Sequence, residues 1–386
     1  MNSNKNEKTA LEGLKVLDLS RFLPGPYCTL LLADFGAEVI MIEQESGSGL
    51  GARRDEFFIF RNKKSIILDL KNNRGREIFF RLAQKSDVIV EGFSPGVMEK
   101  LGIGYPAVRK VNNRIIYCSI CGFGQSGPYR NRIGHDINYV ALSGLLSLTG
   151  RKGQEPGIPG TQIGDVGGGI LGAFSILVAI LAREKTGEGQ YIDISMLDSA
   201  IALNPVSFFE YLLRGEVFGQ GGYRLLGSLP CYNIYKTKDD KYITIGALEP
   251  KFWVNLCKIL NREDLIQKQN EAGDEVFNDV QQIFRLKTQA EWNELLGSED
   301  VCYAPVLNLQ EAIEDPQIRH RDMIIDNPAS AKTRIKEIGI VPKFSLTPGQ
   351  IRRPSPVPGQ DTEEILAEMG VPPSEIVKLR SEGVIK

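Results

Sequence analysis

Short apolar runs alternate with amphipathic stretches over the first half of the chain. The apolar runs have the length and the β-branched content of buried strands, and they lie at 14–20, 36–43, 65–70, 87–91 and 114–118. Between them, 27–35 and 73–86 carry apolar residues at helical spacing. Strands that alternate with helices pair in parallel through right-handed crossovers. The pattern therefore predicts an α/β fold whose large domain is a Rossmann-like, mostly parallel sheet.

The second half of the chain has a different texture. A long apolar helix is expected from Gly164 to Lys185, then a strand at 191–194 and helical character over 196–213. The runs 232–235 and 242–245 flank a Lys/Asp turn and predict a β-hairpin. Charged and amide-rich helices follow at 252–260 and 274–284. A Pro-rich segment, 342–360, precedes a final amphipathic stretch, 363–379, that is expected to pack back.

These changes predict three parts. Residues 1–225 form the first part of a large α/β domain, residues 231–315 form a smaller α+β domain, and residues 316–386 return to the large domain. The glycine-rich connection 219–224 separates the first two parts, as glycine clusters often do.

The most apolar segment, 166–182, is slightly short for a membrane span. It contains four glycines and is bounded by Asp165 and Arg183, which favours a buried core helix. The first eight residues are polar and lack the apolar core of a secretory signal. We therefore expect a cytoplasmic protein that does not enter a membrane.

Charge and cysteine content exclude some classes of function. Lys and Arg number 46 against 48 Asp and Glu, a net charge of −2, which lacks the basic excess of a nucleic-acid binder. Six cysteines are too few for a disulfide scaffold in 386 residues. Cys118 and Cys121 form a C-x-x-C, but no second Cys/His pair has metal-ligand spacing. Packing is the favoured role for both, and no metal site is expected.

Three residues stand out as candidates for chemistry, although each also has an ordinary structural explanation. His135 is one of only two histidines and lies between a glycine and a carboxylate. Asp165 precedes three glycines at the start of the long helix, where N-capping would also account for an aspartate. Glu249 precedes a proline, which is common at helix starts.

The glycines Gly167, Gly168 and Gly169 suggest a place for close approach of a ligand. Without Cβ atoms they let a ligand reach the backbone, and N–H groups at a positive helix end suit an oxyanion. The run matches neither G-x-G-x-x-G nor a Walker loop.

Taken together, these elements resemble the class III CoA-transferase family, and within it the α-methylacyl-CoA racemase branch. The resemblance covers nearly the whole chain. It rests on a series of blocks in order, at 11–20, 24–26, 33–39, 61–65, 68–71, 122–128, 185–190 and 193–196. The racemase branch is marked by G-H-D-I-N-Y at 134–139 and by E-P-x-F at 249–252.

The resemblance implies roles for particular residues. Asp165, His135 and Glu249 would be catalytic. Coenzyme A, bound as part of the substrate with no permanent cofactor, would contact Arg61, Lys63, Lys64, Gly92, Phe93, Ser94, Lys100, Gly134, Asp136 and Tyr139. Ser94 and Lys100 stand where racemases usually have arginines. Relatives also imply an interlocked homodimer.

Two reactions are compatible with this resemblance. Inverting the carbon next to a thioester needs a base on one face and an acid on the other. Histidine and aspartate have reference pKa values of about 6.5 and 3.9, so modest shifts would let His135 and Asp165 share that work. We therefore favour racemisation of a 2-methyl or other 2-branched acyl-CoA.

The alternative reaction is transfer of CoA between carboxylic acids, with Asp165 as the nucleophile that passes through an acyl anhydride and an enzyme–CoA thioester. A free carboxylate would then be the acceptor. A third reading, an inactive partner subunit of a hetero-oligomer, is disfavoured because His135, Asp165 and Glu249 are all present.

Overall fold

The computed structural model describes residues 9–44, 57–326 and 336–386, and within them the chain forms two compact units. Unit 1 comprises 1–143, 161–204 and 317–386, and unit 2 comprises 144–160 and 205–316. The expected small domain, 231–315, lies inside unit 2. Residues 144–160 and 205–225, which the sequence grouped with the large domain, belong to unit 2 instead. The glycine-rich connection 219–224 therefore lies within unit 2 and does not mark its start.

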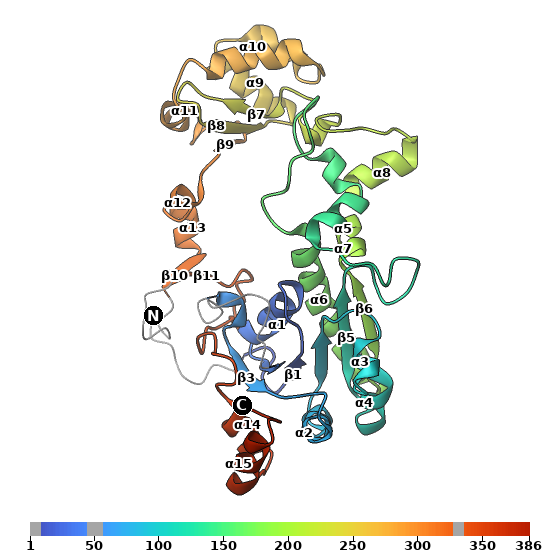
Figure 1. The fold of residues 1–386 in the computed structure, drawn as a ribbon. Coiled ribbons are helices and arrows are strands. Elements are labelled where there is room, and N and C mark those ends of the chain that lie inside the picture. The colour runs from blue at the N-terminus through green and yellow to red at the C-terminus, as the bar shows by residue number, and fades with distance from the viewer. Residues whose placement is uncertain (1–8, 45–56, 327–335) are drawn as a thin grey trace. The chain divides into compact units, whose positions relative to one another are not determined.

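A six-stranded parallel sheet is the centre of unit 1 (Figure 1). Its order is β3-β2-β1-β4-β5-β6, and every neighbouring pair is parallel. The strands are β1 (Lys15–Asp18), β2 (Glu38–Glu43), β3 (Lys63–Ile67), β4 (Val88–Glu91), β5 (Ile116–Cys121) and β6 (Tyr191–Ser195). The order reverses between β1 and β4, as in Rossmann-like sheets. The predicted fold class of the large domain is confirmed.

Helices cover the sheet and join its strands. They are α1 (Pro24–Asp34), α2 (Asn73–Gln84), α3 (Val97–Lys100), α4 (Tyr105–Val111), α5 (Asp136–Leu142), α6 (Ile163–Thr186) and α7 (Met196–Ala202), with a 3-10 turn η2 (Phe58–Phe60). Two buried clusters follow. In one, Phe79 of α2 packs with Ile89 and Tyr117 of the sheet; in the other, Leu32 of α1 and Ile176 of α6 pack with Val90.

The long apolar helix α6 packs one face into unit 1. Its glycines lie against α1 and α7, and Ile176 is fully buried. The opposite face exposes Ile170, Phe174 and Leu181. By length and composition α6 could also cross a membrane, the one such helix in the described part of the chain. Its glycine-mediated packing against α1 is typical of a core helix.

The predicted helix 196–213 is broken in the structure. It ends as α7 at Ala202, and a new helix, α8 (Pro205–Arg214), begins at a proline. Proline lacks the N–H and clashes with the preceding turn, so it starts a helix rather than continuing one. This break is also where the chain passes from unit 1 into unit 2.

Unit 2 is built on a small antiparallel sheet of β7 (Tyr232–Lys236), β8 (Tyr242–Gly246) and β9 (Tyr303–Pro305). The predicted hairpin is β7–β8. Short helices surround it: η3 (Leu145–Leu148), η4 (Arg224–Leu226), α9 (Pro250–Ile259), η5 (Glu263–Lys268), α10 (Asp274–Phe284), α11 (Gln289–Leu296) and α12 (Leu309–Ala312). Trp253, Phe284 and Trp292 fill the core, and each indole N–H donates to a backbone carbonyl, of Leu265 and Phe284 respectively.

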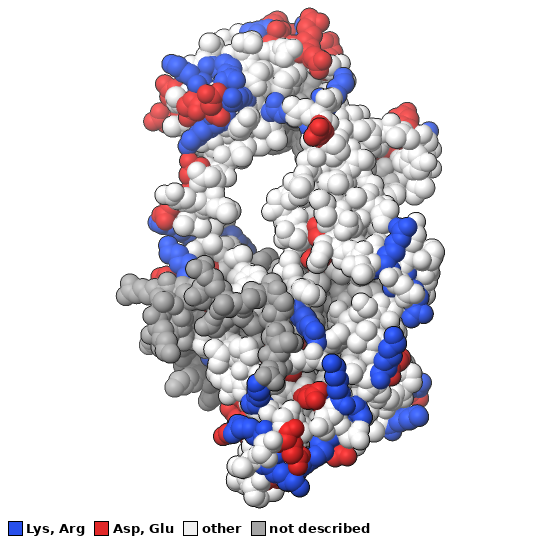
Figure 2. Space-filling model, in the orientation of Figure 1, with Lys and Arg blue, Asp and Glu red and all other residues white. Residues whose placement is uncertain are grey.

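The last part of the chain returns to unit 1. After α13 (Pro316–His320), β10 (Ile324–Asp326) pairs with β11 (Lys336–Ile338), and α14 (Thr362–Glu368) and α15 (Pro373–Ser381) follow. Backbone bonds tie this return down: the Asn62 N–H donates to Arg353, and the Asp361 N–H donates to Ser65. In Figure 2, charged side chains of both signs gather over α14 and α15, and also over α10 and α11 of unit 2.

Candidate active site

Two helix starts carry the proposed proton-transfer groups. His135 is the N-cap of α5, one residue before the helix begins. The Asn138 side chain accepts the His135 backbone N–H at 3.0 Å, and the Asn138 N–H donates back to the His135 carbonyl at 2.8 Å. These bonds fix the backbone while the His135 side chain stays exposed. This capping starts α5 at Asp136.

Asp136 connects the start of α5 to the start of α6. Its Oδ1 accepts the backbone N–H groups of Gly164 at 2.7 Å and Asp165 at 3.0 Å. The first N–H groups of a helix have no partner within it, and the N-cap of α6, Gln162, gives no side-chain bond. Asp136 therefore caps α6 from another helix, and its implied contact with CoA stays a prediction.

Because Asp136 caps α6, the Asp165 carboxylate is not needed to accept the N–H groups at the start of this helix. Asp165 is the third residue of α6, and within the described residues its side chain has no hydrogen-bond or ion-pair partner. The pKa of Asp165 is raised to about 6: burial is the largest cause, the nearby Asp136 carboxylate also raises it, and the His135 charge lowers it. His135 is thus close enough to act on Asp165, and N-capping by Asp165 is excluded.

Close packing beneath the start of α6 explains the glycine before Asp165. A Cβ on Gly164 would lie 3.2 Å from both Asp136 Oδ1 and the Met196 carbonyl, and 3.6 Å from Tyr139 Cβ. Tyr139 itself is buried, and its hydroxyl donates to the Gly134 carbonyl at 2.5 Å. This bond ties Tyr139 to the residue before His135, and a contact of Tyr139 or Gly134 with CoA stays a prediction.

The glycines Gly167, Gly168 and Gly169 do not form an oxyanion site. They lie inside α6, where backbone N–H groups bond within the helix. A Cβ on Gly169 would lie 2.7 Å from the Pro24 carbonyl, and one on Gly167 would lie 2.6 Å from Leu203. The prediction was wrong because the absent side chains admit neighbouring helices rather than a ligand.

Glu249 lies in unit 2 as the exposed N-cap of α9, ahead of Pro250. Its carbonyl starts the helix, whereas its side chain makes no capping bond. Its charge raises the pKa of Cys302, after the larger effect of burial. Cys302 lines a cavity of about 1180 Å³ within unit 2, whose walls include Ile245 and Phe277. A catalytic role for Glu249 stays a prediction.

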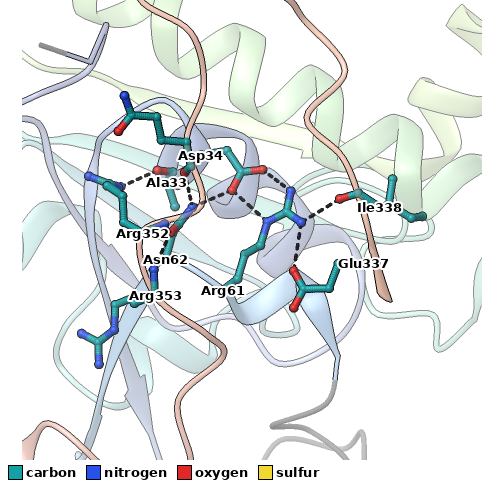
Figure 3. A network of polar contacts seen from close by, with 9 residues as sticks. Ala33, Asp34, Arg61, Asn62, Glu337, Ile338, Arg352 and Arg353 are labelled. Atoms are coloured by element: carbon teal, nitrogen blue, oxygen red, sulfur yellow. Dashed lines mark hydrogen bonds and ion pairs between the residues drawn. The ribbon is translucent and has the colours of Figure 1, made fainter. Parts of the chain in front are cut away.

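Arg61 is buried in an ion-pair network and does not face a ligand (Figure 3). Its Nε and Nη2 donate to the Asp34 carboxylate at 3.1 and 2.7 Å. Its Nη1 donates to Glu337 at 3.1 Å and to the Ile338 carbonyl at 2.7 Å. The predicted phosphate contact is therefore wrong: the guanidinium holds the C-terminal return against α1.

Lys63 and Lys64 are also occupied within the fold. Lys63 is fully buried and donates to the Pro26 carbonyl at 2.8 Å and to Asp18 at 3.3 Å. Lys64 pairs with Glu364 at 2.8 Å and Glu368 at 3.0 Å. Both lysines of the predicted phosphate-binding cluster therefore form ion pairs with carboxylates of this chain. The sequence alone does not reveal these pairs.

The remaining predicted CoA contacts surround the end of β4. Gly92 and Ser94 are exposed, Phe93 is half-buried, and Lys100 is exposed at the end of α3. The structure leaves all four accessible, so their contact with CoA stays a prediction.

Cysteines and metal clusters add nothing to the site. All six cysteines are free thiols. Cys118 and Cys121 lie in β5, and residues three apart in a strand point to opposite faces. Within the described residues no group of three or more His, Cys, Asp or Glu side chains could hold a metal ion.

Sequence reasoning missed the capping role of Asp136 and did not single out Arg21. The cap depends on α5 and α6 meeting, for which the sequence offered no signal beyond an aspartate next to His135. Arg21 belongs to no motif, yet its guanidinium stacks over Phe93 at the end of β4.

Comparisons with known proteins identify the family of this chain. The model of CoA-transferase family III matches residues 11–362. Human alpha-methylacyl-CoA racemase is 36% identical and the match covers 98% of each chain. Human succinyl-CoA:glutarate CoA-transferase is 32% identical over 95% of this chain and 87% of that protein. A crystal structure of a CAIB/BAIF family protein from Brucella suis superimposes with a TM-score of 0.82 at 27% identity, covering 94% of this chain and 100% of that chain. An enzyme fold, a matching family model and relatives over the full length lead to one conclusion: this chain belongs to CoA-transferase family III.

Proposed function

We propose that this enzyme inverts the α-carbon of a 2-methyl or other 2-branched acyl-CoA. The observation that carries the proposal is the meeting of two helix starts, which brings the His135 imidazole near an Asp165 carboxylate whose pKa is raised to about 6. A carboxylic acid with that pKa lies close to the range of an imidazole, so a proton can pass in either direction at neutral pH.

In this reaction one group removes the α-proton and the other returns a proton on the opposite face. When Asp165 is the base, the proton moves from carbon to its carboxylate, and His135 must start protonated to complete the inversion. In the reverse direction the two groups exchange roles. Asp136 keeps the Asp165 backbone fixed throughout, because both of its bonds are to N–H groups.

The second candidate is transfer of CoA between carboxylic acids. It is favoured by the unpartnered Asp165 carboxylate, which could attack a thioester, and by relatives named as CoA-transferases at 30–34% identity. In this reaction the Asp165 carboxylate attacks the thioester, forms an acyl anhydride and releases CoA thiolate. The thiolate then attacks the aspartyl carbonyl, which forms an enzyme–CoA thioester and releases the donor acid as a carboxylate. The acceptor carboxylate repeats these two steps in reverse, which yields the new acyl-CoA and frees Asp165. His135 has no required part in it.

We also propose that the enzyme acts as an interlocked homodimer. Two exposed apolar faces support this assembly. In unit 1, α6 exposes Ile170, Phe174 and Leu181; in unit 2, α8 exposes Phe209 and Leu212, and Figure 2 shows a largely uncharged surface over α8. Exposed apolar patches of this kind are typical of contacts between chains.

Incubation of a single enantiomer of a 2-methylacyl-CoA in D2O tests the proposed reaction. We expect deuterium at the α-carbon together with loss of optical purity. Transfer of CoA to a labelled free acid, with an Asp165 adduct trapped by hydroxylamine, would instead establish the second candidate. Asp165→Asn should abolish either reaction, whereas His135→Ala should abolish only racemisation. Absence of α-deuteration in the wild-type enzyme across a panel of branched acyl-CoAs would rule out the racemase.

A further inference from the structure

Arg21 lies where an open parallel sheet usually binds its ligand. The strand order reverses between β1 and β4, and ligands bind beyond the carboxyl ends of such a pair. The segments that leave these two strands run side by side. The Leu19 N–H donates to the Val90 carbonyl at 2.8 Å, and a Cβ on Gly92 would lie 3.5 Å from Ser20 Cβ. Arg21 is the next residue along the first segment.

The Arg21 guanidinium is half-buried and carries an unpaired charge. Its central carbon lies 4.8 Å from the centroid of the Phe93 ring. Within residues 9–44, 57–326 and 336–386, no carboxylate forms an ion pair with it. The two nearest carboxylates in sequence have other partners: Asp18 pairs with Lys63, and Glu91 accepts the Phe93 N–H at 2.7 Å.

Partial burial of the Arg21 guanidinium costs free energy unless an anion binds to it. Burial lowers the pKa of Arg21, and in the described part of the chain no carboxylate charge offsets that shift. A guanidinium that is partly removed from water and left without a carboxylate is unfavourable. Elsewhere in unit 1 the buried Arg61 has two carboxylates, so the chain does pair its buried cations when they serve the fold.

The start of α1 offers few backbone N–H groups to an anion. In most sheets of this order the N–H groups that start the first helix bind a diphosphate. Here α1 begins Pro24-Gly25-Pro26, and proline has no N–H. The Tyr27 N–H is already used by the Leu23 carbonyl at 3.0 Å. Two of the first three residues of α1 thus lack an N–H, and the planar fork of Arg21, three residues before the helix, has no carboxylate partner within the described residues.

We propose that Arg21 binds the diphosphate of the CoA thioester, with the Phe93 ring holding the guanidinium in place. The planar fork of arginine matches two phosphate oxygens at once. This inference rests on the proposed use of CoA thioesters, but it does not depend on which reaction follows at Asp165.

Calorimetric titration tests the assignment, with three probes of decreasing size. CoA carries both the diphosphate and the 3′-phosphate, dephospho-CoA carries only the diphosphate, and pantetheine carries neither. In Arg21→Gln we expect the Kd to rise at least about tenfold for CoA and dephospho-CoA, as for loss of a hydrogen-bonded charge, with pantetheine unchanged. Arg109→Gln removes an exposed arginine paired with Glu188 and serves as the matched control.

Three outcomes would overturn the proposal. Equal Kd values for wild type and Arg21→Gln on all probes would remove Arg21 from binding. A loss with CoA that disappears with dephospho-CoA would move the contact to the 3′-phosphate. An equal loss with pantetheine, or a lower urea midpoint than Arg109→Gln, would make the residue structural. Wild-type protein that binds CoA but gives neither α-deuteration nor CoA transfer would refute the proposed function alone.

Discussion

Unit 1 treats buried charge in two opposite ways. At Arg61 every charge has a partner: the guanidinium meets Asp34, Glu337 and a backbone carbonyl, and all are buried. At the starts of α5 and α6 two carboxylates, Asp136 and Asp165, lie close together, and Asp165 has no partner within the described residues. Both arrangements cost desolvation, but only the first recovers it within the fold.

The difference separates charges that hold the fold from charges that can react. A paired arginine has little to offer a ligand, whereas a carboxylate with a raised pKa can accept and release protons near neutral pH. The same comparison distinguishes Arg61 from Arg21, which has no carboxylate partner in the described part of the chain and for which we propose a ligand.

The largest expected effect is on turnover. Asp165→Asn removes the proton acceptor without changing the size of the side chain, and the backbone bonds to Asp136 remain. We expect kcat to fall about 100- to 10,000-fold, the usual contribution of a general acid or base. Turnover with folded protein, checked by circular dichroism, measures it. Residual activity within tenfold of wild type would contradict the assignment.

Breaking the paired region should instead reduce stability. Arg61→Met removes the guanidinium that the buried Asp34 and Glu337 carboxylates share, which costs about 3–5 kcal/mol. The exposed pair between Arg109 and Glu188 provides the control, since Arg109→Met should cost about 0–1 kcal/mol. Urea unfolding of both variants gives the two values, and equal costs would mean that the network contributes no more than a surface pair.

A smaller effect should separate the two roles of Asp136. Asp136→Asn keeps an oxygen to accept the Gly164 and Asp165 N–H groups but removes the negative charge. Because that charge raises the pKa of Asp165, the acidic limb of kcat/KM should move to lower pH, by about one unit or less. Asp136→Ala should lower kcat as well. An unmoved limb in Asp136→Asn would show that burial alone sets the pKa.

The smallest effect is a gain in stability when the reactive carboxylate is removed. The fold raises the pKa of Asp165 from 3.8 to about 6, so the folded state holds the proton more tightly than the unfolded chain. Stability from this group is present below pH 4 and is lost as the pH rises through about 6. Asp165→Asn should therefore be about 1–2 kcal/mol more stable than wild type at pH 8, allowing for partial exposure. The gain should vanish at pH 4, and a gain that is independent of pH would contradict this origin.

Periodicity determined the architecture of this protein without coordinates. Short apolar runs such as 87–91 and the helical spacing of 274–284 predicted β4 and α10, because strand and helix periods are properties of local sequence. The resemblance carried by the blocks from 11–20 to 193–196 placed the chain in its family. The G-H-D-I-N-Y motif and the glycines after Asp165 identified His135 and Asp165 as candidates.

Only the tertiary structure decided which of the candidate side chains are available. Arg61 and Lys63 looked basic enough for phosphates, but their partners Asp34, Glu337 and Asp18 lie up to 276 residues away in the chain. In the sequence the glycines of α6 are compatible with a ligand or with close helix packing, and in the structure α1 and α7 pack on them. A charge or a missing Cβ is visible in a sequence, whereas its partner is set by the packing of distant segments, and the partner determines whether the residue stabilises the fold or remains free for chemistry.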